Sequence, residues 1–286
     1  MKRLAFSLRL GLIRLAFRVL GMLAPSTAAN WAYRLWYTTH RAKEPRREQR
    51  QRENAQSFWL EHEYGRIAAY RWGDSQRPLV FCMHGWNGRA AQLGTIIEAF
   101  VADGYRAVAF DAPGHGYSDK QATNIFEIAT VLKTLIDQEG MPAIMIGHSF
   151  GCMILAYALR QYGLTPEKLV FISAPTSTRY LIDQFAHTLR IPDKVMKIFH
   201  ANLKAQFGED VYERISAEQN MRGSEIPLLI VHDRQDRAVS WRNSQRVAEA
   251  AKSADTLYTE GLGHQRILRD KQVIRRILAF AKGDVA

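Results

Sequence analysis

The chain has 286 residues, enough for one large α/β domain with insertions or for two small domains. Apolar residues make up 47% of it, so the chain can bury a sizeable core. Two cysteines, Cys82 and Cys152, are too few for a disulfide framework and favour a reducing compartment.

The net charge of +11 is unevenly distributed along the sequence. Residues 1–52 contain twelve Lys or Arg and two Glu, whereas the remainder contains twenty-seven Lys or Arg and twenty-six Asp or Glu. The basic excess therefore belongs to the N-terminal segment. Because the rest of the chain is nearly neutral, we expect no nucleic-acid partner.

Residues 1–23 predict an amphipathic helix. Arg3, Arg14 and Arg18 fall on one narrow face at helical spacing, and apolar residues fill the rest. Basic residues interrupt every window long enough to span a bilayer, and they occupy the place where a cleavable signal needs an uncharged apolar core. Two interpretations stay open: the helix lies in a membrane interface, or it docks on its own domain or on a second subunit.

Residues 24–55 complete the N-terminal segment. Four aromatic residues lie between Asn30 and Tyr37, which suits a membrane interface or packing over a domain. A membrane surface is thus a candidate partner for residues 1–37. The densely charged stretch from His40 to Glu53 is typical of a solvated helix or linker, and we place the start of the main domain at residue 56.

The main domain, residues 56–286, alternates between strand and helix patterns. A hairpin is predicted around Glu63-Tyr64-Gly65. Further strands are predicted at 79–83, 106–110, 143–146, 168–172, 228–231 and 256–258. Helical patterns fall at 91–102, 126–138, 150–161, 242–252 and 265–281. This alternation predicts an α/β fold, a mostly parallel sheet with helices on both faces and antiparallel strands at one edge.

One interval breaks the alternation. About fifty residues without a strand signal separate residue 172 from residue 228, and residues 178–221 resemble several short helices with apolar faces. An insertion at the carboxyl end of a strand lies where such sheets bind ligands. We therefore predict a helical cap or lid at about residues 176–222.

The segment from Gly147 to Gly151 matches the pattern Gly-x-Ser-x-Gly between a predicted strand and a predicted helix. Such a turn holds Ser149 at its apex in a strained conformation, and glycines on either side let neighbouring backbone approach. The start of the following helix favours negative charge. A pattern of five residues also occurs by chance at ordinary turns, but here the flanks fit, so Ser149 is the predicted nucleophile.

A serine hydroxyl needs a general base, and the base needs an orienting acid. His264 lies on a glycine-rich loop after the last predicted strand, from which it can reach the turn. His148 is adjacent to Ser149, so we expect its side chain to point elsewhere. Asp233 and Asp236 both follow the strand at 228–231; we assign Asp236 as the acid and Asp233 as structural. The order serine, acid, histidine is the one expected for this turn.

A tetrahedral intermediate needs two N–H donors for its oxyanion. The backbone of Phe150, directly after the nucleophile, is one candidate. The other is expected from the loop after the strand at 79–83, which reads His84-Gly85-Trp86. We assign the backbone N–H of Trp86 as the second donor.

With these motifs the chain resembles the α/β-hydrolase fold superfamily over residues 57–282, and within it the capped esterase, lipase and lysophospholipase-like group. The resemblance also rests on the run from Asp111 to Ser118, and it implies that His115 belongs to a structural turn. The sequence departs from the family pattern at three positions. Asp233 stands where a glycine is usual before the acid, Cys152 where a second glycine is common, and Ser240 where proline is common.

The predicted function is that of a serine hydrolase that cleaves carboxylic esters through an acyl-enzyme intermediate, with acyl-chain or lipid-like esters as the candidate substrates. The same triad serves a peptidase, a thioesterase or a carbon–carbon bond hydrolase, and a non-catalytic binding protein on a hydrolase scaffold is a further alternative. The serine argues against the aspartate-nucleophile dehalogenases and epoxide hydrolases of this fold.

No paired-cysteine or His-x-x-x-His spacing suggests a metal site, so we expect neither metal nor cofactor. We expect a cytoplasmic location, with a peripheral position at the inner face of a membrane as the alternative.

Overall fold

The structure, a computed structural model, describes the backbone of residues 2–283 and the side chains from Leu8 onward within that range. The chain divides into two compact units. A helical unit combines the residues up to Thr38 with residues 177–214, and a sheet domain combines residues 39–176 with the chain from Ile215 onward.

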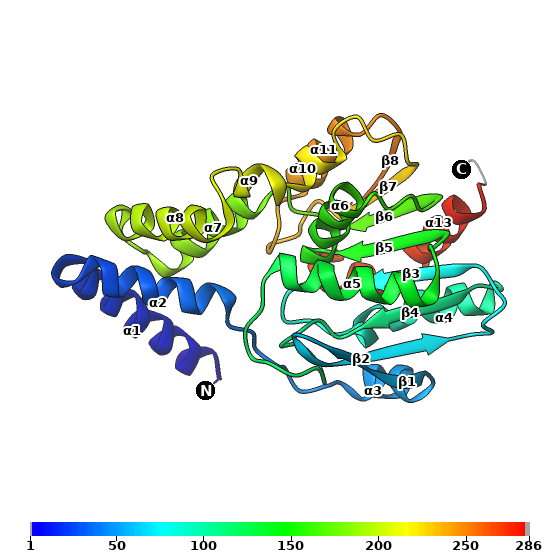
Figure 1. The fold of residues 1–286 in the computed structure, drawn as a ribbon, viewed down its shortest axis with the longest axis horizontal. Helices are drawn as coiled ribbons and strands as arrows, with labels where there is room; N and C mark the ends of the chain where they lie inside the picture. The colour runs from blue at the N-terminus through cyan, green and yellow to red at the C-terminus, as the bar shows by residue number, and fades with distance from the viewer. Residues whose placement is uncertain (1, 284–286) are drawn as a thin grey trace. The chain divides into compact units, whose positions relative to one another are not determined.

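The sheet domain is built on an eight-stranded sheet within the described residues, in the order β1-β2-β4-β3-β5-β6-β7-β8 (Figure 1). The strands are β1 (Gln56–His62), β2 (Gly65–Trp72), β3 (Leu79–Met83), β4 (Arg106–Phe110), β5 (Ile144–His148), β6 (Lys168–Ile172), β7 (Leu228–Asp233) and β8 (Ala254–Thr259). The β1–β2 hairpin pairs antiparallel with itself and with β4, and every other pairing is parallel. This topology confirms the predicted fold class.

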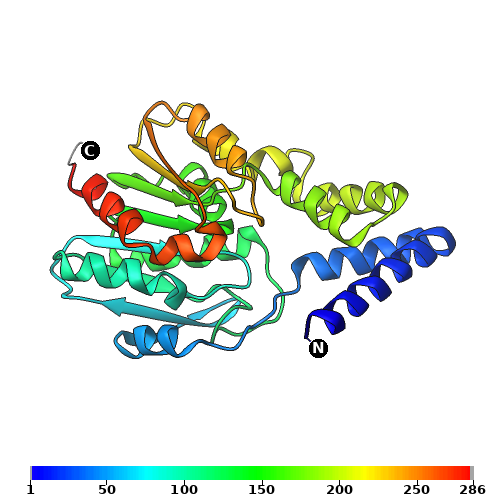
Figure 2. The ribbon, with the colours of Figure 1, turned by 180° about the vertical axis from the view of Figure 1, so that it is seen from behind.

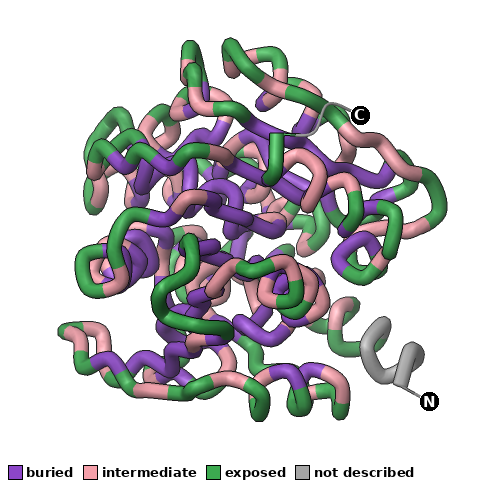
Figure 3. Tube along the Cα trace, turned by 90° about the vertical axis from the view of Figure 1, so that its right-hand side faces the viewer, coloured by how far each residue is buried: buried purple, intermediate pink, exposed green. Residues whose placement is uncertain are grey.

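Helices cover both faces of this sheet. In the sheet domain they are α3 (Arg46–Glu53), η1 (Ala90–Leu93), α4 (Gly94–Ala102), α5 (Ile125–Glu139), α6 (Phe150–Tyr162), α10 (Ala217–Met221), α11 (Trp241–Ala250), α12 (Gly263–Arg266), η2 (Ile267–Arg269) and α13 (Lys271–Lys282). Helices α5 and α6 lie on one face, and Figure 2 shows α4 and α13 on the other. Strand β3 is covered on both faces and is apolar along its whole length, and β3 and β5 are buried at every position. Figure 3 shows long buried stretches of the chain in purple.

The helical unit contains α1 (Lys2–Leu23), α2 (Pro25–Tyr37), α7 (Thr178–Leu189), α8 (Asp193–Phe207) and α9 (Val211–Arg214). Its core is aromatic: fully buried Phe17 stacks on Trp31 with ring centroids 4.3 Å apart, and Trp36 meets Phe185 at 5.4 Å. The predicted amphipathic helix therefore forms, and one of its faces packs with α2 and with the inserted helices of the same chain.

No helix in the described part of the chain combines the length and apolarity needed to cross a bilayer. In α1 the limit comes from its basic residues, since Arg9, Arg14 and Arg18 recur about once per turn.

The charged stretch predicted to be a solvated helix or linker forms the helix α3, which is exposed along much of its length but buries two side chains. Glu48 and Gln51 are buried, and the indole Nε1 of Trp72 donates a 2.9 Å hydrogen bond to the carbonyl of Gln51. The Gln51 amide in turn donates to Thr95 and Glu98. Composition does not show these two contacts, because single polar residues of a charged helix can find partners on a neighbouring surface.

Candidate active site

Ser149 occupies the junction between β5 and α6 with a backbone φ of +54° and ψ of −121°. Positive φ is costly for a residue with a side chain and persists only where the surroundings enforce it. The surroundings are tight: a Cβ at Gly151 would collide with the carbonyl oxygen of Met83, and one at Gly147 would lie 2.8 Å from the Cα of Cys152. The glycines of the motif are therefore required by close backbone approach.

The loop after β3 passes directly over Ser149. A Cβ at Gly85 would lie 3.0 Å from the Cβ of Ser149, so only glycine fits without displacement. The Trp86 ring packs edge-on against Phe150, with centroids 5.3 Å apart, and against His115 at 5.1 Å. The two residues assigned to the oxyanion hole thus lie side by side, next to the turn that carries the serine.

Two buried histidines hold this loop region in place. His84 donates through Nδ1 to the carbonyl of Gly85 at 2.7 Å and accepts through Nε2 from the Ala112 N–H at 3.0 Å. Burial, reinforced by neighbouring His115, lowers the pKa of His84 to about 3, so its ring is neutral and can play both roles. His115 contacts the Pro113 carbonyl at 3.0 Å, and burial lowers its pKa to about 4.

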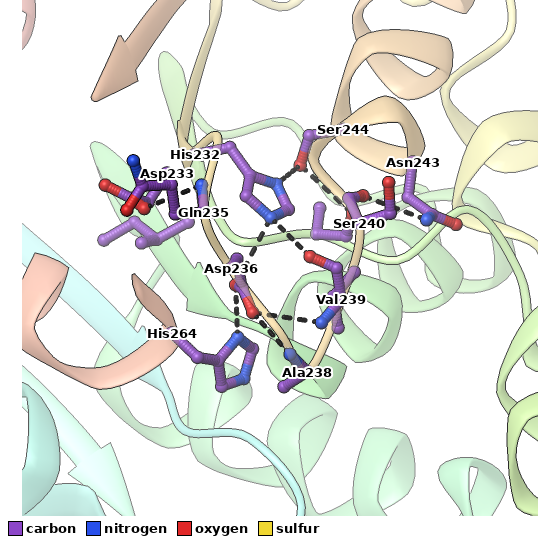
Figure 4. Close-up of polar contacts among 12 residues, drawn as sticks. His232, Asp233, Gln235, Asp236, Ala238, Val239, Ser240, Asn243, Ser244 and His264 are labelled. Carbon is purple, nitrogen blue, oxygen red and sulfur yellow. Dashed lines mark hydrogen bonds and ion pairs between the residues drawn. The ribbon is translucent and has the colours of Figure 1, made fainter. Parts of the chain in front are cut away.

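Asp236, on the loop after β7, and His264, in the short helix α12, are brought together (Figure 4). The Nδ1 of His264 lies 2.7 Å from Oδ2 of Asp236, while Oδ1 accepts from the backbone N–H groups of Ala238 and Val239. An imidazole that donates from Nδ1 to a carboxylate keeps a lone pair on Nε2. This geometry leaves Nε2 free to accept a proton.

The Asp236 carboxylate is held in its ionised form. Its side chain is fully buried, and burial alone would raise its pKa. Hydrogen bonds from His232 and His264 and from the Val239 N–H outweigh that effect and hold the pKa well below its usual range. The orienting group is therefore an anion at all physiological pH values.

Several known proteins resemble this chain in sequence or in fold. A family model described as the alpha/beta hydrolase fold matches residues 78–202. The human serine hydrolase-like protein is 31% identical over 120 residues, covering 39% of this chain and only 57% of that protein. A bifunctional esterase/perhydrolase of Acinetobacter calcoaceticus is 24% identical over 261 residues, covering 74% of this chain and 94% of the relative. The crystal structure of a membrane phospholipase A has the same fold, with a TM-score of 0.64 at 17% identity over 99% of both chains.

The chain has the α/β-hydrolase fold. This confirms the resemblance carried by the sequence motifs, and the relatives of this α/β hydrolase include esterase-like and serine hydrolase-like proteins. Among the described residues, no group of three or more His, Cys, Asp or Glu side chains is arranged to hold a metal ion.

One contact in this α/β hydrolase was not anticipated from the sequence. The buried ring of His148 donates from Nε2 to the backbone carbonyl of His264 at 3.0 Å, and the two rings lie 4.7 Å apart. Burial and the adjacent His264 lower the pKa of His148 to about 3, so the ring stays neutral. The residue before Ser149 therefore holds the backbone of α12 at His264, across 116 positions of sequence.

His232 was also missed by sequence reasoning. Its Nε2 lies 3.3 Å from Oδ2 of Asp236 and 3.0 Å from the Val239 carbonyl, and its Nδ1 lies 2.6 Å from the Ser244 hydroxyl. The sequence did contain a signal for this role. His232 is a polar residue that directly follows the apolar run of residues 228–231, and it lies four residues before Asp236.

Asp233 holds the loop that leads to His264. Its Oδ2 accepts from the Thr259 hydroxyl and from the Leu262 N–H, each at 2.8 Å. It ties the end of β7 to the chain just before His264. Among the described residues, no hydrogen bond joins the Ser149 hydroxyl to the His264 ring.

Proposed function

We propose that this protein is a serine hydrolase that cleaves carboxylic esters through an acyl-enzyme intermediate. The observation that carries the proposal is the combination of a strained serine turn with a buried aspartate–imidazole pair whose backbone is bonded to the residue preceding that serine. Serine hydrolases of unrelated folds share this set of roles.

In the first half-reaction, the Ser149 hydroxyl oxygen attacks the acyl carbonyl carbon while His264 Nε2 takes the hydroxyl proton. Asp236 stabilises the imidazolium that forms, because its carboxylate already accepts from Nδ1. The carbonyl oxygen becomes an oxyanion that accepts from the N–H groups of Trp86 and Phe150. Collapse of this intermediate breaks the ester bond, and the leaving alcohol takes the proton from His264.

In the second half-reaction, water attacks the acyl-serine carbonyl and gives a proton to His264. The same N–H groups stabilise the second oxyanion. Its collapse breaks the bond to the Ser149 oxygen, which recovers the proton, and releases a carboxylic acid. The overall reaction consumes one water and yields one alcohol and one acid.

The substrate class that we propose is an ester with an acyl chain of lipid-like length. The insertion helices α7 and α8 are amphipathic, and the chain is similar in fold to a membrane phospholipase A. The lid role of residues 176–222 and the cytoplasmic location stay predictions.

The test is hydrolysis of chromogenic esters with acyl chains from about two to sixteen carbons, with a thioester included, by the full chain and by Ser149→Ala. We expect the variant to lose roughly 10³-fold or more in kcat, because the residual rate would come from binding and the oxyanion donors alone. The length optimum then defines the acyl chain that the protein prefers.

A second serine provides a matched control. Ser173 also has a positive φ, of 55°, but it is fully buried and unable to meet an ester. Ser173→Ala should keep hydrolysis and labelling by a fluorophosphonate, whereas Ser149→Ala should lose both. A folded wild-type protein that neither reacts with the probe nor hydrolyses any ester would favour the binding-protein alternative.

A further inference from the structure

Helix α1 presents an apolar face to the solvent. Most of the large hydrophobic side chains that are exposed in the described structure belong to this one helix, namely Leu8, Leu12, Leu15, Val19, Met22 and Leu23. Leu12 is 67% exposed and Leu23 is 79% exposed. A contiguous apolar face of this kind is unusual on a soluble surface and marks a site of interaction.

The exposed face is a continuous stripe along the helix. At 100° per residue, Leu8, Leu12, Leu15, Val19 and Met22 fall within a sector roughly 100° wide. The other side of the helix is already occupied within the helical unit, where Phe17 is fully buried and a Cβ at Gly21 would lie 2.9 Å from Pro192. Helix α1 therefore has one face satisfied by its own chain and one face left open.

Basic residues border the stripe on both sides. Arg9 and Arg18 are exposed, and the helical periodicity places them at opposite edges of the apolar sector. Residues 1–38 contain six Lys or Arg and no Asp or Glu. A second copy of this chain would bring the same uncompensated positive charge against it, whereas an anionic lipid surface would neutralise it.

We propose that α1 lies in the interface of an anionic phospholipid bilayer. The leucine stripe inserts at the level of the acyl boundary, and the arginines at its edges meet the headgroup phosphates. The helix lies in the plane of the membrane, since its basic residues prevent it from crossing. This inference holds whether or not the protein hydrolyses esters.

A cationic cavity in the same helical unit suits a phosphate headgroup. It has a volume of about 880 Å³ and is lined by residues of α1, α7 and α8 together with the turn between α7 and α8. Arg14, Arg190 and Lys197 contribute positive charge to its lining and Asp193 contributes one negative charge, while Arg179 is paired with Asp183, so the lining keeps a positive excess. Around the axis of α1, Arg14 lies about 40° from Arg18, which borders the leucine stripe. Because Arg14 also lines the cavity, the cavity lies next to the basic edge of the stripe.

The test is sedimentation of the full chain with phosphatidylcholine vesicles that contain or lack phosphatidylglycerol. We expect binding to the phosphatidylglycerol vesicles, weakened by salt because the headgroup contacts are screened. Leu12→Glu combined with Leu15→Glu should lower the partition coefficient by about tenfold or more, because two carboxylates replace apolar groups and repel the anionic surface. Arg9→Gln with Arg18→Gln should abolish the preference for phosphatidylglycerol.

Matched variants separate this effect from a change in folding. Met141 is also an exposed hydrophobic residue, but it lies in the sheet domain, and Met141→Glu should bind vesicles like the wild type. Ser149→Ala should also bind like the wild type, so the outcome does not depend on the proposed hydrolysis. Arg190→Gln with Lys197→Gln should weaken binding to phosphatidylglycerol alone if the cavity takes the headgroup.

Two results would overturn the proposal. One is unchanged vesicle binding by the Leu12→Glu, Leu15→Glu variant. The other is a wild-type dimer that this variant converts to a monomer with no vesicle binding by either, which would assign the stripe to a second copy. Circular dichroism of each variant establishes that it has folded.

Discussion

The helical unit and the sheet domain are stabilised by different kinds of interior. The sheet domain buries many polar groups, among them His84, His148, His232 and Asp236, and each of these makes hydrogen bonds that fix a loop. In the described part of the helical unit, the only buried polar residue is Thr178, and its core is aromatic and aliphatic. Buried polar networks specify one arrangement of loops, whereas apolar packing specifies only that faces meet.

The two regions also differ in charge. The helical unit has twelve Lys or Arg against five Asp or Glu, and the sheet domain has twenty-seven against twenty-three. The proposed hydrolysis, which depends on one precise geometry, is assigned to the polar, nearly neutral sheet domain. The region with exposed apolar and basic groups suits a surface contact that needs no such precision.

The largest expected effect comes from removing the charge that orients the base. Asp236→Asn should lower kcat for ester hydrolysis by roughly 10³- to 10⁴-fold, because an amide no longer selects the tautomer with the proton on Nδ1. Steady-state kinetics of the folded variant measures this.

Asp233→Asn is the matched control for that variant. Its carboxylate anchors the loop before His264 without contacting the imidazole, so stability should fall more than kcat. An equal loss of kcat in both variants would contradict the assignment of Asp236 as the orienting acid.

A smaller effect should be confined to the helical unit. Phe17→Ala removes a fully buried ring from its core and should destabilise the packing of α1 by about 3–5 kcal/mol. Hydrogen exchange should show loss of protection in α1 and α2 but not in β3 and β5. Leu12→Ala, at an exposed position of the same helix, should change stability by less than about 0.5 kcal/mol. Loss of protection throughout the sheet would contradict the expectation that the effect of Phe17→Ala is confined to the helical unit.

The smallest effect per residue concerns the buried histidines of the sheet domain. His84 and His148 have pKa values of about 3 and His115 of about 4 when folded, against about 6.5 when unfolded. Below pH 6.5 the unfolded chain binds protons that the folded chain does not, so the free energy of unfolding falls as the pH falls. Each histidine contributes a slope of about 1.4 kcal/mol per pH unit between pH 6 and 5.

Denaturant unfolding at a series of pH values measures that slope. His148→Gln removes one titrating group, while its amide can still donate to the His264 carbonyl. The slope of the unfolding free energy against pH should therefore decrease by the contribution of one histidine. A slope that stays the same would mean that His148 is not neutral in the folded protein.

The sequence by itself determined the fold class and the serine turn. Strands β3, β4 and β6 have the predicted limits because a strand covered on both faces is a continuous apolar run, which is visible locally. Strands β5 and β7 extend past their predicted ends to His148 and Asp233. Their last residues are not apolar, but their backbones still form the hydrogen bonds of the sheet. The placement of Ser149 followed from local chemistry, since glycine and strand-to-helix patterns are short-range signals.

Only the tertiary structure shows which hydrogen-bond partners the residues around the serine turn have. The contact of His148 with the His264 backbone and that of His232 with Asp236 depend on how distant loops meet at the end of the sheet. The union of residues 1–38 with the insertion in one helical unit, and the choice of which face of α1 is buried, also depend on long-range packing. An amphipathic pattern shows that a helix has an apolar side, but what covers that side is set by surfaces far away in the sequence.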